Sequence, residues 1–210
     1  MRYLILSDIH ANWEALQAVR AHVRRKRFDK VVFLGDAVGY GASPNRVLDW
    51  LRSLGNSLLA VRGNHDRVCT GLDSAEYFNR YARQAAEWTL SRLEDRNLEY
   101  LRSFPEGPLE LEDGVAICHG SSVDEDAYVF SAYDAQLAFA GMSHPVIFFG
   151  HTHVPSLFML RDDNGKQTLK VRLLTGRRLV LDLDPGNERG RAAALPEAPA
   201  VEQRSSSSCR

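Results

Sequence analysis

Five short segments of the sequence each lead from apolar residues into side chains that can bind a metal ion. They read LILSDIH (4–10), VVFLGDAVGYG (31–41), VRGNHD (61–66), VAICHG (115–120) and FFGHTHVP (148–155). Their β-branched and aliphatic residues are typical of buried strands, and the polar residues follow where each strand would end. The segments supply seven candidate ligands: Asp8, His10, Asp36, Asn64, His119, His151 and His153.

The types of these side chains indicate divalent metal ions. A histidine pair such as His151 and His153 is more often a hydrogen-bonded structural feature than a site, but ligand residues at five strand ends form a stronger pattern. Carboxylate, imidazole and amide donors suit Mn, Fe, Zn or Ni, of which we expect Mn first. Seven ligands are too many for one tetrahedral ion, so the pattern predicts two metals. In such a site a bridging carboxylate fits between the ions, and a shared water is deprotonated near neutral pH to become a nucleophile.

Alternating strands and helices would position these residues. Apolar runs predict strands near 3–7, 30–34, 57–61, 115–118 and 145–149, and helical patterns cover 12–26, 44–54 and most of 74–103. This alternation predicts a layered α/β core, in which loops at the strand ends converge on a ligand. Beyond residue 155, two strand patterns flank Asn164-Gly165, which is a β-hairpin signature, and LVLDL (179–183) predicts a further strand.

The composition is that of an ordinary globular protein. The 210 residues are 44% hydrophobic and 25% charged, with a formal net charge of -1, which gives no general attraction to nucleic acid or anionic membranes. We expect one domain over 1–184 and a disordered tail over 185–210, which is rich in Ala, Pro, Glu, Arg and Ser. The chain has neither a signal-peptide pattern nor a long apolar stretch, which predicts a cytoplasmic protein. Three cysteines at unrelated spacings indicate neither disulfides nor a thiolate metal site, and the oligomeric state stays open.

In their order along the chain, the motifs D-x-H, G-D, G-N-H-D, H-G and G-H-T-H resemble those of the calcineurin-like metallophosphoesterase superfamily. They occur here as Asp8-Ile9-His10, Gly35-Asp36, Gly63-Asn64-His65-Asp66, His119-Gly120 and Gly150-His151-Thr152-His153. The stretches DIHAN (8–12), GDAVGYG (35–41) and HGS (119–121) further resemble its compact bacterial phosphodiesterase-like branch. The resemblance implies an α/β fold, a four-layer αββα sandwich with two mixed β-sheets, and a metal-dependent phosphoric ester hydrolase.

The resemblance also implies a role for each motif residue. It assigns Asp8, His10 and His153 to one metal. Asn64, His119 and His151 would hold the other metal, and Asp36 would bridge the two. His65 matches a residue that faces the substrate as a general acid or transition-state stabiliser, and Asp66 would orient its ring and favour its protonated form. Asn64, His65 and Tyr40 are the candidate substrate contacts.

The expected substrate is a small phosphodiester or nucleotide-type ester. Two aspartates against two divalent ions leave the inner site positive, which suits a phosphate. Ser/Thr protein phosphatases of this superfamily carry an arginine after G-D and read G-N-H-E, whereas Ala37 follows Asp36 here and Asp66 follows His65. A Ser/Thr protein phosphatase or phosphomonoesterase stays an alternative, as does a non-catalytic protein that binds phosphorylated ligands through its metals.

The C-terminal part departs from the pattern of close relatives. These usually follow the hairpin with an Asn-Pro-Gly-Ser-Val turn and a final strand, whereas this chain has Asp184-Pro185-Gly186-Asn187. We therefore expect an incomplete C-terminal edge of the sheet.

Overall fold

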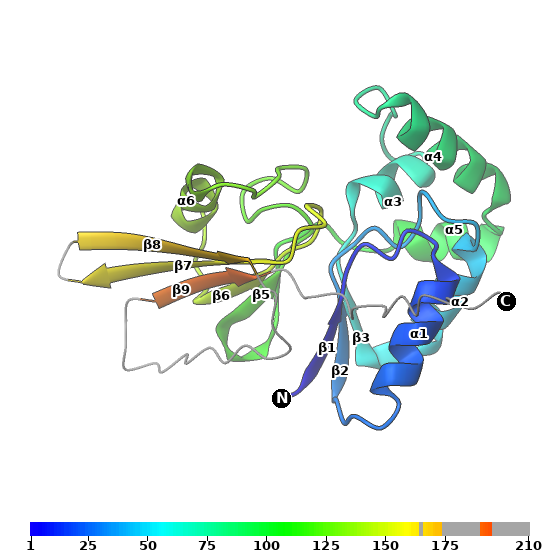
Figure 1. Cartoon of the computed structure of the whole chain (residues 1–210). Helices are drawn as coiled ribbons and strands as arrows, with labels where there is room; N and C mark the ends of the chain where they lie inside the picture. Colours follow the sequence, from blue (N-terminus) through cyan, green and yellow to red (C-terminus); the bar gives the residue numbers. More distant parts are fainter. Residues whose placement is uncertain (164–165, 174–189, 195–210) are drawn as a thin grey trace, which may run out of the picture.

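Two β-sheets form the centre of the fold in a computed structural model, which describes residues 1–163, 166–173 and 190–194 (Figure 1). The first sheet is parallel, with the order β1 (Tyr3–Leu6), β2 (Lys30–Phe33) and β3 (Leu58–Ala60). The second sheet is mixed, with the order β4-β5-β6-β9-β7-β8. Its strands are β4 (Leu109–Glu110), β5 (Val115–Ile117), β6 (Val146–Phe148), β7 (Ser156–Asp163), β8 (Lys166–Leu173) and β9 (Gly190–Ala194).

Helices lie on the outer sides of the two sheets (Figure 1). They are α1 (Trp13–Val23), α2 (Pro44–Ser53), α3 (Asn64–Cys69), α4 (Arg80–Arg92), α5 (Asp95–Arg102) and α6 (Ala132–Ala140). Two short 3-10 turns, η1 (Gly55–Ser57) and η2 (Glu112–Gly114), precede β3 and β5. The start of α1 is capped by Asn12, whose side chain accepts a hydrogen bond from the Ala15 N–H at 3.0 Å. None of the described helices has the length and apolar character that a membrane span requires.

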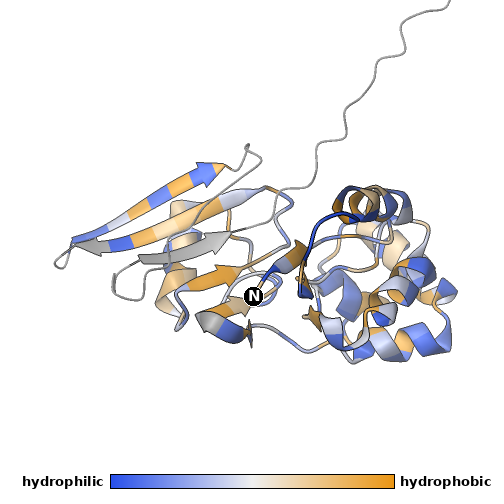
Figure 2. Cartoon of the chain, turned by 90° about the horizontal axis from the view of Figure 1, so that it is seen from below, coloured by the Kyte–Doolittle hydropathy of each residue, from blue (hydrophilic) through white to orange (hydrophobic). Residues whose placement is uncertain are grey.

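The core divides into three hydrophobic clusters because successive strand residues face opposite sides of a sheet. Phe33 of β2 packs toward α2 and α5, and its neighbour Val32 packs against the second sheet. A third cluster, which includes Phe139 and Phe158, lies between the second sheet and α6. Figure 2 shows that β8, at the edge of the second sheet, alternates hydrophilic and hydrophobic residues. The predicted α/β class with two sheets is confirmed, and the full four-layer sandwich stays a prediction.

The C-terminal segment differs from the expected tail where the structure describes it. Strand β9 falls inside residues 185–210, and it pairs in parallel with β6 and antiparallel with β7. Strands β7 and β8 pair antiparallel, as the hairpin pattern predicts. The Asn164-Gly165 turn, the strand at 179–183 and the 184/185 boundary lie outside the described residues, so these expectations stay predictions.

Removal of residues 185–210 is expected to lower the melting temperature by about 5–10 °C. Strand β9 lies between β6 and β7, so its loss leaves both strands without a partner on one side. Each backbone hydrogen bond contributes about 1 kcal/mol net, and about 1 kcal/mol corresponds to 2–4 °C in a chain of this size. Thermal unfolding followed by circular dichroism provides the measurement, with truncation after Ala194 as the control that keeps β9. Equal melting temperatures for the two truncations would contradict a stabilising role of β9.

Candidate metal centre

The seven candidate ligands gather at one end of the two sheets. They follow β1, β2, β3, β5 and β6 directly in sequence. Three groups have potential ligand atoms within 4.8 Å of one another: Asp8, His10 and His153; His10, Asp36 and His65; and Asp36, His119 and His151. Asn64 joins the last group, because its Oδ1 lies 3.1 Å from His119 Nε2. The structure thus brings together the residues that the strand-end pattern predicts.

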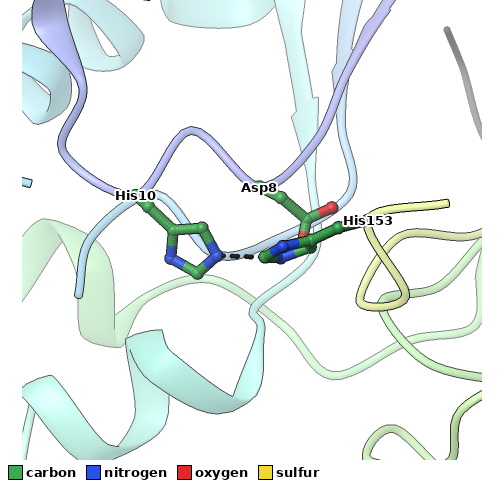
Figure 3. Close-up of side chains that lie close together, drawn as sticks. All are labelled: Asp8, His10 and His153. Carbon is green, nitrogen blue, oxygen red and sulfur yellow. Dashed lines mark hydrogen bonds and ion pairs between the residues drawn. The ribbon is translucent and has the colours of Figure 1, made fainter. Parts of the chain in front are cut away.

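Asp8, His10 and His153 form the first group, from two loops that are far apart in the sequence. His153 Nε2 lies 3.3 Å from Asp8 Oδ1 and 3.1 Å from His10 Nε2. Figure 3 shows Asp8 and His10 on the loop after β1, with the His153 ring reaching them from the loop after β6. One carboxylate and two imidazoles converging in this way fit a borderline divalent ion.

Asp36 lies between the two halves of the site. Its Oδ2 is 3.6 Å from His10 Nε2 and 3.4 Å from His119 Nε2, and the side chain is buried. Its other oxygen, Oδ1, accepts a hydrogen bond from the His65 N–H at 2.9 Å. The carboxylate is therefore fixed with one oxygen directed toward both groups, which is the position that a bridging ligand needs.

Hydrogen bonds to backbone carbonyls orient three of the imidazoles. His10 Nδ1 lies 3.1 Å from the Val38 carbonyl oxygen, and His119 Nδ1 lies 2.8 Å from that of Leu34. A carbonyl oxygen can only accept, so in both rings Nδ1 is the donor, and Nε2 is the nitrogen directed toward the candidate metal centre. His151 is turned the other way, since its Nε2 donates to the Asp126 carbonyl at 3.1 Å and leaves Nδ1 free.

The electrostatics of the site favour a bound cation. Burial disfavours the charge on Asp36, yet His119 and His10 hold the pKa of its carboxyl well below the usual range. Burial likewise disfavours a charged His119, but Asp36 raises the pKa of that ring to about 9. The buried carboxylate thus stabilises positive charge next to it, and a divalent ion would supply that charge. The donor set and the charge distribution both fit metal ions.

Most of the candidate ligands have a left-handed backbone conformation. The φ angles are 52° at Asp8, 48° at His10, 59° at Asp36, 68° at His151 and 54° at His153. This conformation costs an L-residue roughly 1–2 kcal/mol, so the surrounding contacts must stabilise it. In a regular strand, residues two apart point to the same side. The left-handed conformation changes the direction of the side chains. As a result, the His151 ring lies in the group with Asp36, and the His153 ring lies in the group with Asp8.

Asp66 fixes the backbone of the site rather than the ring of His65. Its carboxylate accepts hydrogen bonds from the N–H groups of Asp36 (2.8 Å), Ala37 (2.8 Å), Val38 (3.3 Å) and Gly63 (3.0 Å). All four donors belong to the main chain of the two loops that carry Asp36 and Asn64. The geometry therefore differs from the expectation that Asp66 orients the His65 ring.

His65 is buried in a largely aromatic environment. Its ring centroid lies 4.6 Å from that of Tyr40, 4.5 Å from Phe78 and 4.9 Å from His10. Its Nδ1 is buried with no hydrogen-bond partner among the described residues. Burial lowers the pKa of His65 to about 4, so the ring is neutral near pH 7, contrary to the protonated form expected from the sequence. A Cβ on Gly39, where φ is +126°, would lie 2.6 Å from His65 Nδ1, so only glycine allows this close packing.

Two arginines that flank the G-N-H-D motif are held by carboxylates. Arg62 Nε lies 3.0 Å from Glu125 Oε2, and Arg62 Nη2 lies 2.8 Å from Glu106 Oε2. Arg67 also binds Glu125, and its Nη2 lies 2.6 Å from Asp126 Oδ2. The loop after β5, residues 121–130, is thereby tied to α3. This loop supplies the Asp126 carbonyl that orients His151.

Arg67→Ala is expected to weaken metal binding by about 10- to 100-fold, the usual cost of losing an interaction that orients a metal ligand. Without Arg67 the loop loses its contacts to α3 through Glu125 and Asp126, and the His151 ring loses its fixed orientation. Calorimetric titration with Mn²⁺ measures the effect, and circular dichroism checks the fold. Arg96→Ala, which removes an arginine paired with Asp49 and Glu94 on the surface, is the matched control. Equal Mn²⁺ affinity in the two variants would contradict this role of Arg67.

A cavity of about 240 Å³ opens onto the candidate ligands. Its lining residues are Asp36, Tyr40, Asn64, His65, Tyr128, His151, Thr152 and His153. Tyr40, which the sequence predicts as a substrate contact, is one of these lining residues. Tyr128 and Thr152 were not predicted as part of the site, and Tyr128 stacks on His151 with ring centroids 3.8 Å apart and an interplanar angle of 18°. No lysine or arginine is among the described residues that line this cavity.

The comparison with protein families agrees with the motifs. Residues 1–155 match the family model described as calcineurin-like phosphoesterase, and this segment includes all seven candidate ligands. The chain belongs to the calcineurin-like phosphoesterase family. The resemblance read from the motifs is thus confirmed, and the metal dependence of this family agrees with the ligand groups described above.

Individual family members and solved structures extend this result. Protein MJ0912 of Methanocaldococcus jannaschii, which is uncharacterized, is 36% identical over 158 residues, covering 72% of this chain and 62% of that protein. The chain thus spans less than two thirds of this relative. A metallophosphoesterase structure from Sphaerobacter thermophilus has a TM-score of 0.71 at 35% identity. The match covers 94% of this chain and 76% of the Sphaerobacter chain. Protein PH1004 of Pyrococcus horikoshii OT3 shares the fold, with a TM-score of 0.64 at 18% identity over 73% of this chain and 70% of its own.

Proposed function

We propose that this protein is a metal-dependent phosphoric ester hydrolase that cleaves small phosphodiesters, including nucleotide-type esters. The observation that carries the proposal is the composition of the cavity wall. The candidate metal ligands Asp36, Asn64, His151 and His153 line it together with His65 and two tyrosines, and no lysine or arginine is among the described lining residues.

The lack of a cationic side chain favours diesters over monoesters. A phosphomonoester carries about 1.5 to 2 negative charges near pH 7 and is often bound by arginine, whereas a diester carries one charge. Arg62 and Arg67 are the arginines beside the G-N-H-D motif, and both are paired with carboxylates. The cavity therefore offers little charge compensation beyond that of bound ions. A Ser/Thr protein phosphatase or phosphomonoesterase is the second, less favoured candidate.

In this proposal some residues bind the metal ions and others contact the phosphoester. Asp8, His10 and His153 would hold one ion. Asn64, His119 and His151 would hold the other, with Asp36 between them. When bound, two divalent ions neutralise phosphate charge and make water nucleophilic near neutral pH.

The contacting groups lie on the wall of the cavity. Asn64 and His65 would hydrogen-bond the phosphoryl oxygens, and Tyr40 would contact the rest of the ester. Asp66 acts indirectly, because its carboxylate accepts hydrogen bonds from the backbone N–H groups of Asp36 and Ala37. A cytoplasmic location belongs to the proposal on the basis of the sequence alone.

The test is Mn²⁺-dependent hydrolysis of bis-p-nitrophenyl phosphate compared with p-nitrophenyl phosphate. We expect the diester to have the higher kcat/KM, and a chelator to abolish turnover in a way that added Mn²⁺ restores. Faster hydrolysis of the monoester would favour the phosphomonoesterase alternative. Binding of phosphate and Mn²⁺ without turnover of either ester would favour a non-catalytic phospho-ligand-binding protein.

A further inference from the structure

We propose that Tyr40 and Tyr128 form a subsite for a planar, nucleobase-like group on the substrate, so that the preferred diester carries a nucleoside. This inference rests on the proposed phosphodiesterase function and specifies its substrate class. Both tyrosines line the cavity, yet about half of each residue remains exposed, 49% for Tyr40 and 50% for Tyr128. Large aromatic residues left half-exposed beside a reactive centre are typical of ligand contacts.

The two tyrosines flank different parts of the candidate metal centre. Tyr40, on the loop after β2, packs against His10 and His65 with ring centroids 4.9 and 4.6 Å away. Tyr128, on the loop after β5, stacks on His151. A diester bound at the ligand groups would therefore have one tyrosine near the His10 part of the site and the other near the His151 part.

A further aromatic ring extends the surface of Tyr128 outward. Phe130 is 56% exposed, and its ring is nearly parallel to that of Tyr128, with an interplanar angle of 10° and a centroid distance of 5.1 Å. Val129 between them is buried and anchors the loop in the cluster beneath α6. Arg67 ties the same loop to α3 through Glu125 and Asp126. The aromatic surface is therefore held in place before a ligand binds, which reduces the entropy lost on binding.

The chemistry of the cavity selects a planar and uncharged group. A second phosphate would need a cation, and the described lining residues include none. A nucleobase has a π-face that stacks on tyrosine or phenylalanine, and such stacking changes affinity by about 5- to 150-fold per base. An alkyl group gains no comparable interaction.

The experiment compares two diesters with the same leaving group, thymidine 5′-(p-nitrophenyl) phosphate and methyl p-nitrophenyl phosphate, in the Mn²⁺-loaded protein. Because the bond that breaks is the same, the ratio of their kcat/KM values reports only the group that stays on phosphorus. We expect a ratio of about tenfold or more in the wild type. Tyr128→Leu and Tyr40→Leu should lower it toward 1, and Tyr128→Phe, which keeps the ring, should preserve most of it. Tyr133→Leu is the control, since Tyr133 is 67% exposed on α6 and does not line the cavity.

The outcomes separate this inference from the proposed function. A ratio near 1 in the wild type, with both esters hydrolysed, would overturn the subsite and leave the phosphodiesterase intact. A high ratio that the tyrosine variants do not change would also overturn it. If neither ester is hydrolysed, calorimetric binding of thymidine 5′-monophosphate and of inorganic phosphate to the Mn²⁺-loaded protein decides. The subsite would be supported if the nucleotide binds more tightly than inorganic phosphate and Tyr128→Leu abolishes this difference. Equal affinities of the two ligands for the wild type would exclude the subsite.

Discussion

Asp36→Asn is expected to lower diester hydrolysis by roughly 10³-fold and to leave the protein with fewer than two bound metal ions. Metal ions contribute several kcal/mol of transition-state stabilisation, and about 1.4 kcal/mol corresponds to a factor of ten. In the variant, the amide oxygen can keep the hydrogen bond from the His65 N–H. The NH₂ group then faces His10 and His119 and offers no lone pair where Oδ2 lies in the native protein.

The measurement combines elemental analysis of the purified variant with its kcat on bis-p-nitrophenyl phosphate. Circular dichroism establishes that the fold is kept. Asp95→Asn, at an exposed position in the first turn of α5, is the matched control for removing one carboxylate. Two retained ions together with near-normal turnover would refute the bridging position of Asp36.

His65→Ala is expected to keep the metal content and to slow hydrolysis by about 10²-fold, the lower end of the usual effect of a side chain that assists proton transfer or stabilises charge. His65 lines the cavity next to Asn64, where it can reach the phosphoryl group or the leaving oxygen. Its ring is enclosed by Tyr40 and Phe78, and Asp66 hydrogen-bonds to the backbone instead. We therefore expect a neutral hydrogen-bond donor that stabilises phosphoryl charge.

This role predicts an equal loss for good and poor leaving groups. The measurement is kcat for a nitrophenyl diester and an alkyl diester in the wild type and the variant, with metal content determined alongside. A much larger loss for the alkyl diester would instead indicate a general acid, since an alkoxide needs a proton and a nitrophenolate does not. Loss of metal would make His65 a ligand or a structural residue. His22→Ala, which removes an exposed histidine of α1, is the control.

The convergence of the candidate ligands could be predicted from the sequence because each of them follows a short apolar run. Strand ends are encoded locally, and parallel strands such as β1, β2 and β3 bring their carboxyl ends to one edge of a sheet. The role of Asp66 could not be predicted in the same way. Asp66 follows His65 directly, but both lie in the first turn of α3, where successive side chains point about 100° apart.

Other parts of the site depend on contacts between distant segments. The ion pair of Arg67 with Glu125 joins residues 58 positions apart, and neither residue belongs to a motif. Tyr128 has no local pattern that distinguishes it from other surface tyrosines. Strand β9 was missed for a related reason, since Gly-Arg-Ala-Ala-Ala (190–194) lacks β-branched and aromatic residues and forms a strand only through its pairing with β6 and β7.

The left-handed backbone at the candidate ligands has a consequence for protein engineering. At five of the seven positions the direction of the side chain is set by a main-chain conformation that an L-residue avoids, and Asp66 helps to hold that conformation at Asp36. Grafting the seven side chains onto the strand ends of another α/β scaffold would therefore leave most of them pointing in the wrong directions. The transferable unit is the set of loops with their hydrogen-bond donors and acceptors. A scaffold that accepts those loops would also accept their conformational strain, and would need a margin of folding stability of several kcal/mol before it could carry the centre.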